Sequence, residues 1–262
     1  MSNKKRYKVK YSQGGAKGHG QTSAPWDELV GEVIDNSIPV EKPEIPVTIR
    51  VNLNFDKNNL GTLIFADNYR GIPREDMPHI FDLRFSGSSR GKYSRQGMGL
   101  KIAQPALGEL AWIISKTKDD SRIWKLSWIY SDGEDDCEVE IEEYNGNEWD
   151  KAFPSGCESG TIVKIINSKK VRYWSKKQDF KNWCAKFEAS YATDLVKGFC
   201  EIFFTYTKSS KTKNGKINST IWTHVAEPYE PLLTHRIEML DADLLLGKNK
   251  PELDRVPVDL SD

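Results

Sequence analysis

One nine-residue stretch alternates strictly between apolar and polar side chains, and it restricts the fold more than any other feature of this chain. From Val47 to Phe55 the odd positions are apolar, and the even positions are Thr, Arg, Asn and Asn. A period of two predicts a β-strand with one buried face and one wet face. A turn rich in Asp, Asn and Gly follows, and residues 62–66 predict a second strand that ends directly before Asp67. A sheet therefore begins here.

The composition fits one large domain with a sizeable core. Of the 262 residues 38% are apolar, and 38 basic residues balance 38 acidic residues. No overall field would attract nucleic acid or a membrane surface. The sequence has no apolar run long enough to span a membrane, and its start lacks the apolar segment of a secretory signal. We therefore expect a cytoplasmic protein with reduced thiols.

The segment before the alternating strand predicts a two-faced helix. Pro25 favours a helix start, and at about 100° per residue one side of the helix is apolar. The other side is polar and carries Glu28, Glu32, Asp35 and Asn36. Glu32 and Asn36 are four residues apart and therefore neighbours. A carboxylate can activate water and an amide oxygen can ligate magnesium, although the same four residues would also suit a helix face in water.

The rest of the chain predicts mostly antiparallel sheet with a few helices. A short strand is expected near 7–11, and six more at 111–116, 123–130, 137–143, 161–167, 201–207 and 217–224. Helices are expected at 74–83, from about Leu100 onward, and over 176–197, whose aromatic residues we assign to the core. The predicted fold is α+β, a two-layer sandwich with helices on one face of a mixed, mostly antiparallel sheet and a mobile lid. The predicted units are an arm, 1–22, a domain, 23–227, and an extension, 228–262.

Two further segments have the chemistry to contact a nucleotide. Asp67 precedes a tight turn with Gly71 and Ile72, where a carboxylate can accept a hydrogen bond from an adenine amino group while the backbone approaches the ring. The run from Gly97 through Met98, Gly99 and Leu100 to Lys101 joins a loop to a helix, where free N–H groups and a lysine can surround phosphates. Alone, either segment would also suit an ordinary turn or helix start.

In this order the three segments resemble the N, G1 and G2 boxes of the GHKL superfamily, which is named for gyrase, heat-shock chaperones, histidine kinases and MutL. The resemblance covers roughly residues 20–207 and is closest in layout to heat-shock-chaperone and Morc-like members. It implies the Bergerat-type fold, with ATP and magnesium as ligands. Glu32 would match the residue that activates water, and Asn36 the magnesium ligand. Asp67 would match the aspartate that reads adenine.

Two more matches extend the resemblance. Gly160-Thr161 opens a strand, as the family's Gly-Thr pair does near the adenine, so Thr161 joins the adenine contacts. The run 97–101 matches the lid that covers the phosphates, and we expect the lid itself over residues 86–99. The sequence departs from the pattern where Tyr69 replaces the first glycine of D-x-G-x-G, and where Pro39 and Val40 replace a second acidic residue.

The resemblance implies a magnesium-dependent ATP hydrolase that acts as a nucleotide-gated conformational or dimerisation switch. Hydrolysing members usually take a lysine from a second domain, so we expect a homodimer or a partner protein to supply it. The alternative is a non-hydrolysing ATP-binding subunit that regulates a larger complex, such as a DNA-processing or defence system.

Two other interpretations of the sequence compete with this one. Residues 15–22 nearly spell a Walker loop, but Gln21 replaces its essential lysine, which disfavours a P-loop. The basic stretches 169–186 and 208–216, with Tyr173 and Trp174 interleaved, would form a nucleic-acid surface with salt-dependent binding.

Overall fold

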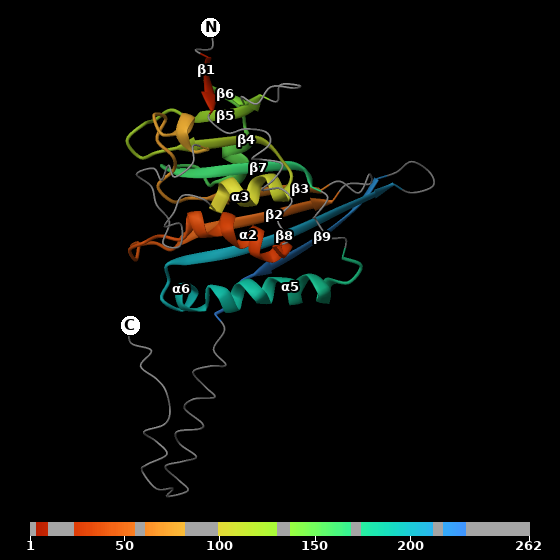
Figure 1. Cartoon of the computed structure of the whole chain (residues 1–262). Coiled ribbons are helices and arrows are strands. Elements are labelled where there is room, and N and C mark those ends of the chain that lie inside the picture. The colour runs from red at the N-terminus through yellow and green to blue at the C-terminus, as the bar shows by residue number, and fades with distance from the viewer. Residues whose placement is uncertain are drawn as a thin grey trace, which may run out of the picture.

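The fold is known from a computed structural model, which describes residues 4–9, 24–55, 61–81, 99–129, 137–168, 174–211 and 217–228. Within these ranges nine strands form one sheet, in the order β1-β6-β5-β4-β7-β3-β2-β8-β9 (Figure 1). The strands are β1 (Lys5–Val9), β2 (Val47–Phe55), β3 (Gly61–Asp67), β4 (Glu109–Lys116), β5 (Trp124–Ile129), β6 (Cys137–Glu143), β7 (Gly160–Ser168), β8 (Cys200–Lys211) and β9 (Ile217–Val225). In the part of the chain described, every neighbouring pair is antiparallel except β2 and β8, which run parallel.

The helices gather mainly on one face of this sheet. They are α2 (Trp26–Ile34), the 3₁₀ turns η1 (Asp35–Ser37) and η2 (Met77–His79), α3 (Gly99–Leu107), α4 (Glu148–Ala152), α5 (Lys177–Ser190) and α6 (Ala192–Val196). In Figure 1 α2 and α3 lie side by side across the central strands, and α5 runs along β8 and β9. The predicted class, an α+β sandwich on a mostly antiparallel sheet, is confirmed.

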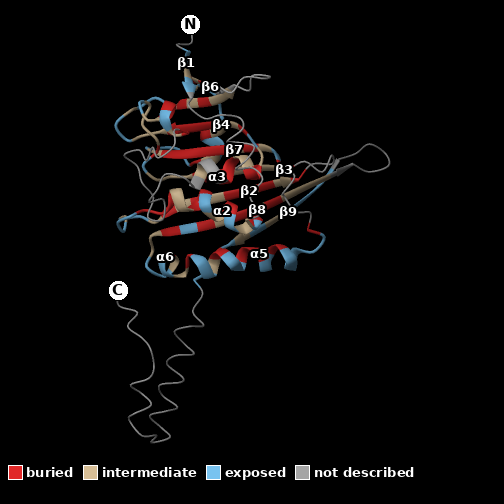
Figure 2. Cartoon of the chain, in the orientation of Figure 1, coloured by how far each residue is buried: buried red, intermediate tan, exposed pale blue. Residues whose placement is uncertain are grey.

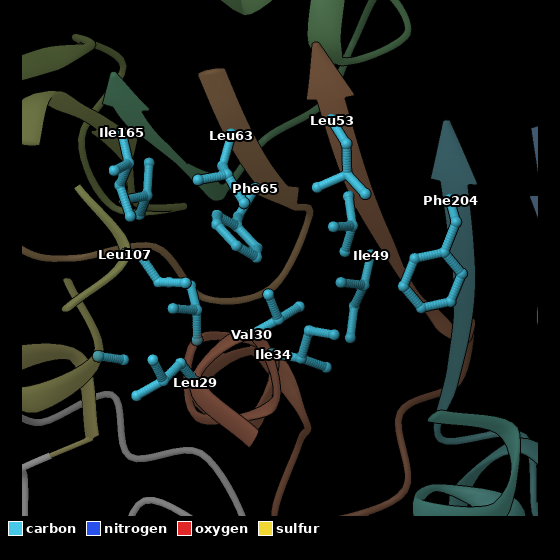
Figure 3. Packing of buried hydrophobic residues seen from close by; sticks show 14 of the residues in the cluster. Leu29, Val30, Ile34, Ile49, Leu53, Leu63, Phe65, Leu107, Ile165 and Phe204 are labelled. Carbon is cyan, nitrogen blue, oxygen red and sulfur yellow. The ribbon is translucent and has the colours of Figure 1, made fainter. Parts of the chain in front are cut away.

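Apolar side chains join α2 to the sheet. In Figure 3 Val30 lies beneath Phe65 of β3, and Ile34 lies beneath Ile49 of β2. Leu29 lies on the side of α3, near Leu107. The strict alternation in β2 buries every odd position, as the sequence predicts (Figure 2). Full burial of each such side chain stabilises the fold by about 1.5–3 kcal/mol. The buried face of α2 therefore fixes its orientation, and with it the direction of its polar residues.

The opposite face of the sheet carries a smaller core. Ala66 belongs to a cluster with Trp149 and Phe153, whereas its neighbour Phe65 belongs to the main core under the helices. Since successive strand residues point to opposite faces, α4 must lie on the face away from α2. The sequence does not predict α4, because five residues are too short for a periodic pattern.

Two helix predictions need correction. The predicted helix 176–197 is broken at Tyr191 (φ −109°, ψ 17°), where the chain leaves helical geometry before α6 begins. The predicted helix at 74–83 is a turn followed by η2, at least as far as residue 81, to which this stretch is described. Pro78 would fall inside that helix, and proline lacks the N–H that a helix interior needs.

The sheet also takes up the beginning of the chain. β1 pairs antiparallel with β6, and Tyr7 lies opposite Val139. The predicted strand at 7–11 therefore lies two residues earlier. The unit boundaries at 22 and 228 adjoin residues outside the described ranges, and they stay a prediction. None of the helices described here is long and apolar enough to cross a membrane.

Candidate nucleotide-binding site

Asp67 ends β3 on the helix side of the sheet, and hydrogen bonds fix its carboxylate. Its Oδ1 accepts from the backbone N–H of Tyr69 at 3.0 Å, and its Oδ2 accepts from the hydroxyl of Ser37 at 3.0 Å. Burial raises the pKa of Asp67 to about 6, although both hydrogen bonds act in the opposite direction. The carboxylate is therefore mostly ionised at neutral pH and remains able to accept a further hydrogen bond.

Two hydroxyl side chains continue the row that Asp67 begins. Thr161 of β7 lies opposite Asp67 in one direction and opposite Ser115 of β4 in the other. The hydroxyls of Ser115 and Thr161 are 3.2 Å apart, and both residues are buried. Antiparallel register thus brings a carboxylate and two hydroxyls onto the same face of three adjacent strands.

The turn after Asp67 is held against this row. The N–H of Ile72 donates to Ser115 Oγ at 2.7 Å, and the Ser115 hydroxyl donates to the carbonyl of Gly160 at 2.8 Å. Gly71 has φ +74°, and a Cβ there would lie 1.9 Å from the carbonyl oxygen of Lys116. A Cβ on Gly160 would lie 2.3 Å from the carbonyl oxygen of Asp67. In the described structure, these two glycines are therefore required because they lie close to the backbone of the sheet. The sequence prediction, in which the backbone approaches an adenine ring, did not include this contact.

Glu32 and Asn36 lie on the polar side of the α2 segment, as predicted. Glu32 is exposed, and Asn36 follows in η1 and is half-buried. The Asn36 Nδ2 donates to the carbonyl of Glu32 at 2.8 Å, which leaves its Oδ1 as the acceptor atom. Ser37, the next residue, is the donor to Asp67. The turn η1 therefore connects the acidic helix end to the carboxylate on β3.

Asp35 does not face open water, although helical periodicity would allow it. It lines a cleft of about 330 Å³ between α2 and α5, together with Glu32 and Tyr191. The Tyr191 hydroxyl donates to Asp35 Oδ1 at 2.7 Å. Burial raises the pKa of Asp35 to about 6, the Tyr191 hydrogen bond lowers it, and the charges of Glu32 and Asp194 raise it further.

The phosphate-binding run is described only in part. Gly99 begins α3, and half-buried Leu100 packs against the main core. Gly97, Met98 and the Lys101 side chain lie outside what the structure describes, so their predicted contacts with phosphate stay predictions. The lid predicted at 86–99 falls almost entirely outside as well.

Tyr69, which stands where the resemblance leads one to expect glycine, is accommodated inside the fold. Its ring packs against the main core, and its buried hydroxyl has no hydrogen-bond partner among the described residues. The guanidinium of Arg70 lies 5.2 Å from the ring centre. The backbone N–H of Tyr69 supports Asp67, so the substitution leaves the carboxylate in place.

These residues fit the ligands that the sequence implies. An ionised, half-buried carboxylate with neighbouring hydroxyls suits the amino edge of a base. Among the described residues no group of three or more His, Cys, Asp or Glu side chains could hold a metal ion. Magnesium does not need one, because it keeps water and phosphate oxygens as ligands, and the Asn36 amide oxygen can complete such a set.

Comparison with known proteins identifies the class. The family model described as histidine kinase-, DNA gyrase B-, and HSP90-like ATPase matches residues 22–146. A curated relative, the B chain of the type 2 DNA topoisomerase 6 of Archaeoglobus fulgidus, is 32% identical over 137 residues, which are 49% of this chain and 22% of the relative. Residues 22–146 therefore match an ATPase domain of the GHKL type, in agreement with the resemblance that the sequence predicts.

Two solved structures are similar at low identity. The N-terminal domain of a DNA repair protein has a TM-score of 0.39 and 14% identity, over 77% of this chain and 53% of that one. The B-subunit of the DNA gyrase from Myxococcus xanthus has a TM-score of 0.38 and 14% identity, over 74% of this chain and 49% of its own. At these scores the two add nothing to the assignment.

Sequence reasoning missed Ser37, Ser115 and Tyr191 as members of the site. Ser115 had a readable signal, because it is a polar residue at a core-facing position of an apolar strand. Ser37 follows Asn36 directly, so its proximity could have been inferred. Tyr191 had no local signal, since its partner Asp35 is 156 residues away.

Proposed function

We propose that the chain binds magnesium-ATP on the helix side of its sheet and hydrolyses it. The observation that carries this proposal is the row formed by Asp67, Thr161 and Ser115 beside the acidic end of α2. Members of the matched family are ATPases by description, which supports ATP as the ligand.

Base recognition would begin with Asp67. Its carboxylate accepts a hydrogen bond from the exocyclic amine of adenine, and the Thr161 hydroxyl supports the neighbouring ring edge. Guanine presents a carbonyl oxygen at that position, which would meet a carboxylate oxygen without a proton between them. The site therefore favours adenine over guanine, because an unpaired buried acceptor is costly. Gly71 and Ile72 supply the backbone wall on this side.

The catalytic end would use Glu32 and Asn36. Asn36 would hold magnesium through Oδ1, and the ion, when bound, neutralises phosphate charge. Glu32 would orient a water molecule and accept its proton as the water attacks the terminal phosphate. The run from Gly97 to Lys101 would surround the phosphates at the start of α3.

The output of the cycle would be a nucleotide-gated switch. Ordering of the segment 86–99 by the terminal phosphate would create a surface for a second copy or for a partner protein that supplies a lysine. The relative from Archaeoglobus fulgidus is named as one subunit of a topoisomerase, which supports a partner in a DNA-processing complex. This chain spans 22% of that relative, so the larger activity is part of the proposal.

The test is a thermal-shift titration with ATP, ADP and a non-hydrolysable analogue, with and without magnesium. We expect the wild type to gain about 3 kcal/mol of stability at a hundredfold excess of ligand over Kd. Asp67→Asn should lose most of this gain, because the amide group cannot accept at both of its positions. No stabilisation of the wild type by any nucleotide would overturn the proposal.

A non-hydrolysing regulatory subunit is the second candidate. The observation that favours it is the exposure of Glu32, which lines the cleft toward α5. Stabilisation by ATP without turnover, alone or with a partner protein, would establish it. The nucleic-acid surface loses one of its expected members, because Trp174 is buried in an aromatic cluster with Trp26 and Trp183.

A further inference from the structure

The hydroxyl of Tyr191 connects α5 to the helix that carries Glu32. Tyr191 is buried at the point where α5 ends, and its hydroxyl oxygen lies 2.7 Å from Asp35 Oδ1 and 3.1 Å from the carbonyl oxygen of Gly31. A phenol has one proton, so both acceptors share it. The shorter contact goes to the carboxylate, as expected for a charge-assisted hydrogen bond.

These contacts hold the last turn of α2. The carbonyl of Gly31 also accepts the backbone N–H of Asp35, which closes the helix. The next carbonyl, that of Glu32, accepts the side-chain amide of Asn36. Tyr191 and Asn36 therefore bind two successive carbonyl groups at the end of the helix. A shift of Tyr191 would move the backbone from which both Glu32 and Asn36 extend.

The contact between Tyr191 and Asp35 lies in a cleft that is rich in carboxylates. Asp27, Glu28, Glu32 and Asp35 line it, and Lys186 forms its ion pair with Asp27 at 2.7 Å. The charge of Asp194 also acts on Asp35. A half-buried carboxylate among like charges lowers stability, and a hydrophobic residue in its place often does not. Such a locally unfavourable choice is typical of functional sites.

We propose that Tyr191 is a positioning residue for ATP hydrolysis, which fixes the last turn of α2 through Asp35 and the Gly31 carbonyl and so aims Glu32 and Asn36. This inference rests on the proposed function of the same site. In this role Tyr191 acts through the helix and not by contact with the substrate. Its effect is on orientation, where displacements of about 1 Å already reduce rates.

The test is Tyr191→Phe, which keeps the ring and removes only the hydroxyl. We expect kcat to fall about tenfold, while the affinity for ATP without magnesium stays within about twofold because base recognition lies on the strands. A second measurement does not need turnover: the gain in affinity for a non-hydrolysable ATP analogue on adding magnesium should shrink by a similar factor. Ser190→Ala is the matched control, since Ser190 lines the same cleft but donates only to Lys186 in its own helix, and it should behave as wild type.

A double-mutant cycle adds a sharper criterion. Asp35→Ala should reduce kcat about as much as Tyr191→Phe, and combining the two should cause little further loss, because Tyr191 acts largely through Asp35. Additive losses would overturn the coupling. A Tyr191→Phe variant with lower thermal stability but wild-type kcat and magnesium gain would overturn the positioning role.

The failure of the proposed function looks different. If the wild type binds the analogue without turning over ATP, hydrolysis is disproved and a role of Tyr191 in turnover falls with it, and the magnesium gain then decides only whether Tyr191 aims Asn36. If the wild type binds no nucleotide, the proposed function and this inference both fall.

Discussion

The proposed base-binding end of the site, around Asp67, lies on three paired strands, whereas the proposed catalytic end, around Glu32 and Asn36, lies on the last turn of one helix and the 3₁₀ turn that follows it. At the base end the partners are set by strand register and by a chain of hydrogen bonds through Ser115. At the catalytic end Asn36 bonds to its own helix, and Tyr191 holds the preceding turn. Ser37 bonds to Asp67 and joins the two ends.

Because of this difference, we expect substitutions at the two ends to affect different properties of the protein. A strand residue cannot move without disturbing its neighbours in the ladder, so the proposed base-binding end is rigid. A helix end has fewer fixed partners and shifts more easily. Changes at the helix should alter turnover before affinity, and changes at the strands should alter stability and affinity together.

The largest difference between the effect on turnover and the effect on ATP affinity is expected for Glu32→Ala. Loss of a general base lowers kcat by about 10²–10⁴-fold, while ATP affinity should stay within about twofold because the base end is unchanged. Phosphate release and calorimetric titration would measure the two quantities. Glu28→Ala, one turn earlier on the same polar face, should keep near-normal turnover. Wild-type turnover by Glu32→Ala would sink the assignment of Glu32 as base.

The next effect is structural and belongs to the base end. Gly71→Ala forces a Cβ to within 1.9 Å of the Lys116 carbonyl oxygen at a positive φ. We expect a loss of about 3–5 kcal/mol in the free energy of unfolding, measured by urea denaturation. Gly156→Ala is the control, because Gly156 also has a positive φ but a Cβ there meets nothing within 4 Å. That variant should lose only about 1 kcal/mol. Equal losses in both would show that backbone strain, not contact with β4, makes Gly71 necessary.

The smallest expected effect is a pH dependence of stability, which comes from two carboxyl groups with raised pKa values. The pKa of Asp67 and that of Asp35 are each raised to about 6 in the folded chain, above the roughly 3.9 of an unfolded aspartate. The folded state then binds more protons than the unfolded state between about pH 4 and pH 6, so the free energy of unfolding falls as pH rises through that window. At pH 7 each ionised carboxylate lowers stability by about 1–2 kcal/mol once solvent screening is allowed for.

Asparagine substitutions would reveal this dependence. Asp67→Asn and Asp35→Asn should both be more stable than wild type at pH 7 and about equal to it at pH 4. The difference in stability between variant and wild type at pH 7 should be larger for Asp67, since Asp35 borders an open cleft. Urea unfolding at pH 4, 5.5 and 7 measures it. A stability difference that stays constant with pH would rule out titration of these groups as its cause.

Much of the fold follows from local pattern. The alternation from Val47 to Phe55 predicts β2 at its observed bounds, and the apolar face of 26–34 predicts α2. Pattern cannot reveal which strands pair, so the parallel contact between β2 and β8 was not predictable. Nor could it show that the helix breaks at Tyr191, because the break accompanies a long-range contact with α2.

The candidate site divides in the same way. Asp67 and Thr161 were predicted together, and the structure pairs them directly across β3 and β7. Helical spacing predicts that Glu32 and Asn36 are neighbours, but it leaves open whether Asp35 faces water or a cleft. The tertiary contact with α5 decides for the cleft. Turn chemistry explains a glycine at position 71. The neighbour that leaves no room for a Cβ there is the Lys116 carbonyl, which lies on a strand far along the chain.

Under the proposed function, the shared register of β3, β7 and β4 links ATP binding to correct folding. A slip of one residue between these strands would turn Asp67, Thr161 or Ser115 to the opposite face of the sheet. The same slip would expose core residues such as Phe65 or Ile113. Misregistered chains would therefore lose their core and their ligand site together. Nucleotide would stabilise only chains that have paired correctly, so its presence during folding would favour the native sheet over its closest competitors.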